Sequence, residues 1–334
     1  MHQNIKILLP VFGDLSLRNL SNIYILDKEL AKGVFIYSKD GEFIRRVGSI
    51  GRGPGEYGGV SDFDFDDNKI IISDHPNKLL IFNEKGDFIS RMTSDFTFSS
   101  FISVDNGYLF FNSYRSSVDN SFFNVIKTDK NLKFMQGYLP YKKELLHSNT
   151  LSYVSHFVRT DNEILFSQAF TNTIYSYKNG QFAAKIKFNF ESKPIPEKLT
   201  TEFLKPEDLV NIFTSGYSRL SEPFYSSSQN GFYSIIYNGT DKYVVQTHNK
   251  KTIIIDYYYD DFFGIPLYSF KGISQNRLIG TVIWGSVLST LNNPKSNYNL
   301  KKPQLKAKLL GFMNKYKLNS EDSEPVIAIF EFKD

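Results

Sequence analysis

The sequence predicts an all-β protein, a six-bladed β-propeller with short helical inserts. Strand-favouring aromatic residues are abundant, with 31 Phe and 21 Tyr in 334 residues. A strand–turn–strand unit recurs after about 45 residues in the N-terminal part of the chain, a period typical of propeller blades. The strands of this unit are nearly continuous apolar runs, as expected where neighbouring blades cover both faces of a sheet.

The repeat is clearest when GVFIYSKDGEFIRRVG (33–48) is aligned with KLLIFNEKGDFISRMT (78–93). Each copy predicts two strands joined by a turn that ends in glycine, which is a hairpin signal. The identical positions are Ile36 and Ile81, Gly41 and Gly86, Phe43 and Phe88, Ile44 and Ile89, and Arg46 and Arg91.

A further strand precedes each copy, and both of these strands end in aspartate. They are IYILD, ending at Asp27, and IIISD, ending at Asp74. Because the two carboxylates recur at one position of the repeat, we expect them to accept hydrogen bonds from loop amides. A metal-binding role is the alternative.

Later strands are fainter, and we expect them at the apolar runs 108–114, 122–128, 163–170, 172–188, 231–238, 241–259, 277–284 and 325–332. Two segments predict helices instead. Pro206, with two acidic residues behind it, marks a helix start within 194–213, and apolar residues recur at helical spacing within 302–319. We expect both helices to pack on the propeller, and residues 1–334 to form a single domain.

The segment GSIGRGPGEYGG (48–59) is the most unusual stretch of the chain. It matches G-x-G-x-x-G, but dinucleotide binding requires a helix after this pattern, and VSDFDF, which follows, predicts a strand. No Gly-Lys-Ser/Thr ending is present for a phosphate loop. We therefore expect an inter-blade connection in which Arg52 and Glu56 pair and Tyr57 inserts between blades.

The stretch from YILDKELAKGVFIYS to GPGEYGGVSDFDFD resembles the Bacteroides-type six-bladed β-propeller family, whose members carry a GPGEY element after a glycine-turn hairpin. The same unit is similar to NHL and TolB-like propellers, and EPVIAIFEFK resembles the family's last strand. The resemblance implies an exported protein, periplasmic or associated with the outer membrane. It also implies a precursor with a signal peptide and often a lipid anchor, of which this chain would be the mature form.

Composition excludes several classes of function. The chain has no cysteine, and its five histidines lack zinc-site spacing. A net charge of +4 over this length gives no support to nucleic-acid binding. No apolar run is long enough to cross a membrane as a helix. We expect no catalytic residue, no metal site and no cofactor.

The preferred function is a non-catalytic module of the bacterial cell envelope that binds a ligand or partner, either a polysaccharide or a protein. A glycan would be held by charged groups beside aromatic rings. The candidate ligand-binding residues are Arg52, Glu56, Asp62, Asp64, Tyr257, Tyr258, Tyr259 and Trp284. The alternative is a calcium-dependent lactonase or esterase with its cation in the central channel, near Asp62 and Asp64.

Overall fold

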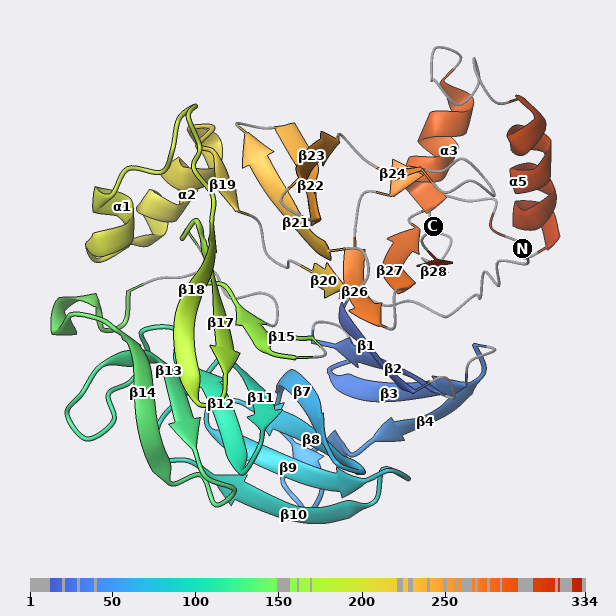
Figure 1. The fold of residues 1–334 in the computed structure, drawn as a ribbon. Helices are drawn as coiled ribbons and strands as arrows, with labels where there is room; N and C mark the ends of the chain where they lie inside the picture. Colours follow the sequence, from blue (N-terminus) through green and yellow to red (C-terminus); the bar gives the residue numbers. More distant parts are fainter. Residues whose placement is uncertain are drawn as a thin grey trace.

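The structure is a computed structural model. It describes residues 13–19, 22–28, 31–38, 41–148, 157–160, 162–168, 170–220, 225–227, 231–238, 241–248, 251–255, 258–259, 266–267, 270–274, 277–282, 284–293, 303–315, 318 and 326–331. In this part of the chain the strands build mainly antiparallel sheets arranged as a β-propeller (Figure 1). The prediction of a propeller is confirmed, but four sheets rather than six have the complete four-strand order of a blade.

The first two sheets contain the sequence repeat. The first has the order β1-β2-β3-β4, with β1 at Gly13–Asn19, β2 at Asn22–Asp27, β3 at Gly33–Ser38 and β4 at Phe43–Val47. The second has the order β7-β8-β9-β10, with β7 at Val60–Asp66, β8 at Lys69–Asp74, β9 at Lys78–Asn83 and β10 at Phe88–Thr93. Between them, β5 (Ser49–Ile50) and β6 (Glu56–Tyr57) form a short parallel pair.

The next two sheets repeat this order without the sequence identity. The third contains β11 at Ser100–Val104, β12 at Gly107–Phe111, β13 at Phe123–Thr128 and β14 at Phe134–Pro140. The fourth contains β15 at Phe157–Arg159, β16 at Ile164–Phe166, β17 at Thr173–Lys178 and β18 at Gln181–Lys187. Strand β12 ends earlier than predicted, so 112–114 belongs to a loop.

The C-terminal strands depart from the four-strand order. A five-stranded sheet contains β19 at Arg219–Leu220, β20 at Tyr225–Ser227, β21 at Gly231–Asn238, β22 at Asp241–His248 and β23 at Lys251–Ile255. A three-stranded sheet contains β26 at Phe270–Ser274, β27 at Arg277–Val282 and β28 at Val326–Glu331. Strands β24 (Tyr258–Tyr259) and β25 (Pro266–Leu267) pair with each other.

Helices occur in both segments where the sequence predicts them. Between β18 and β19 lie α1 (Lys198–Thr201) and α2 (Pro206–Thr214), and near the C-terminus lies α5 (Pro303–Lys315). At the start of α2, the carboxylate of Asp208 accepts a hydrogen bond from the Lys205 N–H at 2.8 Å. A 3₁₀ turn at Lys143–Leu145 and helix α3 (Trp284–Asn292) complete the described helices.

The core lies between the sheets, because each blade buries its inner strands and exposes its last one. Strands β8 and β12 are buried almost throughout, whereas the outermost strands β4 and β10 are largely exposed. Neighbouring sheets meet through their first strands: β7 lies beside β11, and β1 lies beside β26 of the C-terminal sheet (Figure 1). The first and the last sheets are therefore neighbours in the ring.

Alternation of strand direction divides the loops of the first four sheets between two faces of the propeller. The turns that join the first strand to the second and the third strand to the fourth lie on one face, and the connections from the second strand to the third and the crossings from sheet to sheet lie on the other. Hydrogen bonds between these connections show that they share a face, since the Phe98 N–H donates to the Pro76 carbonyl at 3.2 Å. We call this the connection face; its described residues include 48–59, 75–77, 94–99, 112–122, 141–148, 167–168 and 170–172.

Candidate functional site

The glycine loop 48–59 carries the chain from the outer strand β4 to the inner strand β7, and no helix follows it. Several of its amides have acceptors within the protein. Glu56 folds back so that its carboxylate accepts the Gly53 N–H at 2.7 Å. Asp74 accepts the N–H groups of Gly58 and Gly59, each at 3.0 Å. Carboxylates thus occupy the positions that a phosphate would need, and the prediction of an inter-blade connection is correct.

Tyr57 anchors this loop between the first two sheets, as predicted. Its side chain is fully buried among core residues of both sheets, including Val34 and Phe82. The hydroxyl donates to the Val47 carbonyl at 2.9 Å and accepts a hydrogen bond from Arg46 Nε at 3.2 Å. Burial raises the pKa of the Tyr57 phenol, with Arg46 acting in the opposite direction. The ring therefore serves as a neutral core side chain.

Arg52, predicted as the partner of Glu56, does not pair with it. The side chain is exposed, and in the described part of the chain it makes no hydrogen bond or ion pair. Glu56 uses its carboxylate to close the loop instead. Of these two candidate ligand-binding residues, Arg52 is therefore the one whose charged group is not used by an interaction within the loop.

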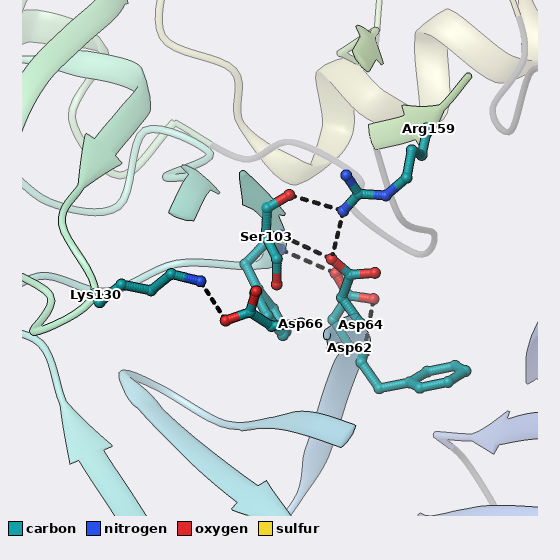
Figure 2. A network of polar contacts seen from close by, with 8 residues as sticks. Asp62, Asp64, Asp66, Ser103, Lys130 and Arg159 are labelled. Atoms are coloured by element: carbon teal, nitrogen blue, oxygen red, sulfur yellow. Dashed lines mark hydrogen bonds and ion pairs between the residues drawn. The ribbon is translucent and has the colours of Figure 1, made fainter. Parts of the chain in front are cut away.

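Asp62 and Asp64 project from the inner strand β7 toward the next sheet rather than into open solvent (Figure 2). Asp62 is buried; its Oδ2 accepts the Phe101 N–H and its Oδ1 the Phe63 N–H, both at 2.9 Å. Asp64 Oδ2 accepts the Ser103 N–H at 2.7 Å. The two carboxylates therefore bind alternate amides along the edge of β11, which the strand order of that sheet leaves unpaired.

Two cationic side chains pair with the more exposed carboxylates of this row. Arg159, at the end of β15, contacts Asp64 at 3.0 Å and donates to the Ser103 carbonyl at 2.7 Å (Figure 2). Lys130 pairs with Asp66, the next acidic residue of β7. The network links the second, third and fourth sheets. Among the described residues, no group of three or more histidine, aspartate or glutamate side chains is arranged to hold a metal ion.

The aromatic candidates lie in the C-terminal part of the chain. Tyr257 is outside the described residues, and Tyr258 and Tyr259 form strand β24. Trp284 does not end a strand as predicted, because β27 stops at Val282 and Trp284 begins helix α3. The run RLIGTVIW is apolar throughout, so its periodicity could not mark the point where strand gives way to helix.

A polar cluster that the sequence does not predict lies on the connection face, around the loop after β12. Asn112 is fully buried, and its Oδ1 accepts the N–H groups of Arg115 at 3.1 Å and Ser116 at 2.9 Å. Asn124 Oδ1 accepts the Tyr114 N–H at 2.9 Å. These bonds hold Ser113 and Tyr114 at φ values of 55° and 59°, in the left-handed region.

Neighbouring connections complete the cluster. The His147 N–H donates to the Tyr114 carbonyl at 2.7 Å, and Gln168 Nε2 reaches the Tyr114 hydroxyl at 3.4 Å. Burial raises the pKa of Tyr141 to about 12, and its ring stacks edge-on against Tyr114. The stretch NSYRSS carries no motif, and only the long polar break between two apolar strands could have drawn attention to it.

No protein among the curated sequences matches this chain significantly. In the described part of the chain, no helix is long and apolar enough to cross a membrane.

Three solved structures are similar to this chain. A protein from Bacteroides fragilis NCTC 9343, named as a candidate exported protein, has a TM-score of 0.77 at 17% identity, covering 99% of this chain and 95% of that one. A streptogramin B lyase has a TM-score of 0.44 at 11% identity, over 80% of this chain and 74% of that one. The extracellular domain of a one-component system from B. thetaiotaomicron has a TM-score of 0.44 at 12% identity, over 80% and 31%.

The family model of a domain of unknown function, DUF4934, matches residues 6–331, and the chain therefore belongs to the DUF4934 family.

Proposed function

We propose that this protein is a non-catalytic binding propeller of the bacterial cell envelope, folded as a single domain over residues 1–334. The observation that supports the proposal is the arrangement of the loops on the connection face. Its loops are fixed to one another by hydrogen bonds, as between Thr97 N–H and Ser116 Oγ at 3.2 Å. A rigid face that gathers loops from successive sheets is the usual arrangement for ligand recognition by a repeat fold.

We also propose that the ring has six units. The four complete sheets are followed by the five-stranded and the three-stranded sheets, and β1 lies beside β26 of the last. Six units in a closed ring would explain why the first and the last sheets are neighbours. The cell-envelope location is supported by the GPGEY resemblance and by the name of the Bacteroides fragilis protein with the same fold.

A glycan is the ligand class that we propose for testing first. Arg52 is exposed without a described partner, and polar side chains of the connection face lie beside rings such as those of Tyr114 and Tyr141. Hydrogen bonds together with ring stacking suit sugars. The predicted residues Tyr257, Tyr258, Tyr259 and Trp284 remain part of this hypothesis, and Asp62, Asp64 and Glu56 have the weaker case, since their carboxylates bind backbone amides.

The test is calorimetry of the protein against neutral and acidic oligosaccharides from bacterial and host surfaces. We expect dissociation constants between micromolar and millimolar, or about 4–8 kcal/mol. Tyr258→Ala should weaken binding if the aromatic segment contributes, and Glu56→Ala serves as the comparison in the glycine loop. Hydrolysis of a lactone or an aryl ester that stops on addition of a chelator would overturn the proposal in favour of the calcium-dependent enzyme.

A further inference from the structure

A positively charged side chain without an acidic partner lies on the connection face. Arg115 follows Tyr114 in the loop after β12 and is half-buried. In the described part of the chain its guanidinium makes no hydrogen bond and no ion pair, although its backbone N–H is bound by Asn112. Burial lowers the pKa of Arg115, as expected for a charge that has lost water without gaining a counterion. Such a charge is costly for the unliganded protein.

His75 adds a second basic group to the same place. It lies in the loop between β8 and β9 with its side chain exposed, and its pKa is lowered first by partial loss of water and then by the positive charge of Arg115. Asp74 acts on His75 in the opposite direction. The Asp74 carboxylate is engaged elsewhere, however, since it binds two amides of the glycine loop and contacts Lys78 Nζ at 3.6 Å.

Hydrogen bonds connect the two loops that carry His75 and Arg115 through the segment 94–99. The Pro76 carbonyl, next to His75, accepts the Phe98 N–H, and the adjacent Thr97 binds Ser116, the residue after Arg115. The left-handed conformation of Ser113 and Tyr114 is maintained by buried hydrogen bonds. Unfavourable backbone conformations that the surroundings impose are typical of sites that are organised before the ligand arrives.

We propose that Arg115 and His75 form a binding site for an anionic group, the carboxylate or phosphate of the ligand. The guanidinium offers paired N–H donors that match the geometry of an oxyanion, and the bound anion supplies the missing counterion. The inference rests on the proposed function, because it assigns the charged part of the ligand to the connection face.

The test is an NMR titration of the imidazole signals, with His75 assigned from the His75→Gln variant. The probes are inorganic phosphate, glucuronate and glucose at constant ionic strength. We expect saturable shifts of the His75 signal with the anions and none with glucose. A preference for glucuronate would identify an acidic sugar, and a preference for phosphate a phosphorylated ligand. A bound anion should also raise the pKa of His75 above the value that it has among the nearby charges of Arg115, Asp74 and Lys78.

Arg115→Gln should weaken anion binding at least tenfold, whereas Arg91→Gln, at an exposed arginine of the outer strand β10, should leave it unchanged. Since Arg115 has no described partner, its replacement should not lower the melting temperature. If Arg115→Gln fails to fold, thermal unfolding with and without phosphate at constant ionic strength replaces the titration of that variant. Phosphate should then raise the melting temperature of the wild-type protein and leave that of His75→Gln unchanged.

Absence of a saturable shift with either anion, or equal affinity in Arg115→Gln, would overturn the inference. If neutral glycans bind in that case, the proposed function stands and only the anion site is wrong. If no neutral or acidic glycan binds and the anions produce no shift, both proposals fail.

Discussion

The hydroxyl of Tyr57 donates a 2.9 Å hydrogen bond to the carbonyl of Val47, the last residue of β4. The bond joins the glycine loop 48–59 to the first sheet, which precedes the loop in the chain. The Tyr57 side chain is fully buried, so water is excluded from this bond. Tyr57→Phe should lower the free energy of unfolding by about 1–2 kcal/mol, because the buried carbonyl loses a donor. Chemical denaturation measures the change. Arg52→Ala, five positions away and exposed, should change stability by less than about 0.5 kcal/mol, and equal effects of both variants would contradict the assigned role.

Two glycines of the same loop allow a matched comparison. Gly55 has φ of 75°, and a Cβ there would lie 2.8 Å from Cβ of Phe88. At Gly59 a Cβ would meet no atom within 4 Å, and the backbone is not left-handed. Gly55→Ala should therefore cost about 1–2 kcal/mol or more, and Gly59→Ala close to nothing. Thermal unfolding of the two variants side by side tests this, and a larger loss in Gly59→Ala would refute it. Gly53, in the same loop, has no positive φ.

The local features of the fold could be predicted from the sequence because short-range geometry determines them. Gly41 and Gly86 occupy equivalent hairpin turns at φ of 88° and 81°, as the aligned repeat predicts. Asp74 binds the amides of Gly58 and Gly59, and Asp27 binds the Ala31 N–H at 3.1 Å, which agrees with the expected role of these carboxylates. Each of these interactions depends on the chain conformation within one repeat.

The candidate site could not be predicted in the same way, because its contacts depend on how the sheets meet. Asp62 binds an amide 39 residues away and Asp64 an arginine 95 residues away. A sequence containing alternate aspartates is equally compatible with a metal site and with such a ladder of hydrogen bonds. Arg115 shows a different limit, since its distinguishing property is the absence of a partner among the described residues, which only the three-dimensional arrangement reveals.

The carboxylate row of β7 should be a structural element of the ring. Asp62→Ala removes the acceptor of the Phe101 N–H and should cost about 2 kcal/mol, measured by denaturation. Arg159→Ala should cost at most about 1 kcal/mol, because its ion pair with Asp64 is partly exposed. If Asp62→Ala is as stable as the wild type but abolishes binding of calcium or a glycan, the carboxylate belongs to a ligand site after all.

Glu163 should make stability depend on pH in the acidic range. Burial raises its pKa, but hydrogen bonds from Lys185 and Ser176 and the nearby lysine charges outweigh burial, so the pKa is lowered overall. Its stabilising contribution is thus present above the unfolded-state pKa and is lost as the pH falls through the folded-state pKa. Glu163→Gln should cost about 0.2–1 kcal/mol near neutral pH, and the difference from wild type should vanish in acid. Glu84→Gln, at an exposed hairpin position, is the control and should show no such pH-dependent difference.

Asn112 should determine the order of the loop that carries Arg115. Its Oδ1 accepts two backbone N–H groups, and its Nδ2 donates to the Phe123 carbonyl at 3.0 Å, all in a fully buried position. Asn112→Ala leaves these groups unpaired and should cost about 2–3 kcal/mol, whereas Ser117→Ala, at an exposed position of the same loop, should be neutral. Hydrogen exchange gives the decisive measurement, because the amides of Arg115 and Ser116 should lose protection in Asn112→Ala before the strands do. Unchanged protection of those two amides would show that the loop is held by other contacts, and that Asn112 does not organise the connection face.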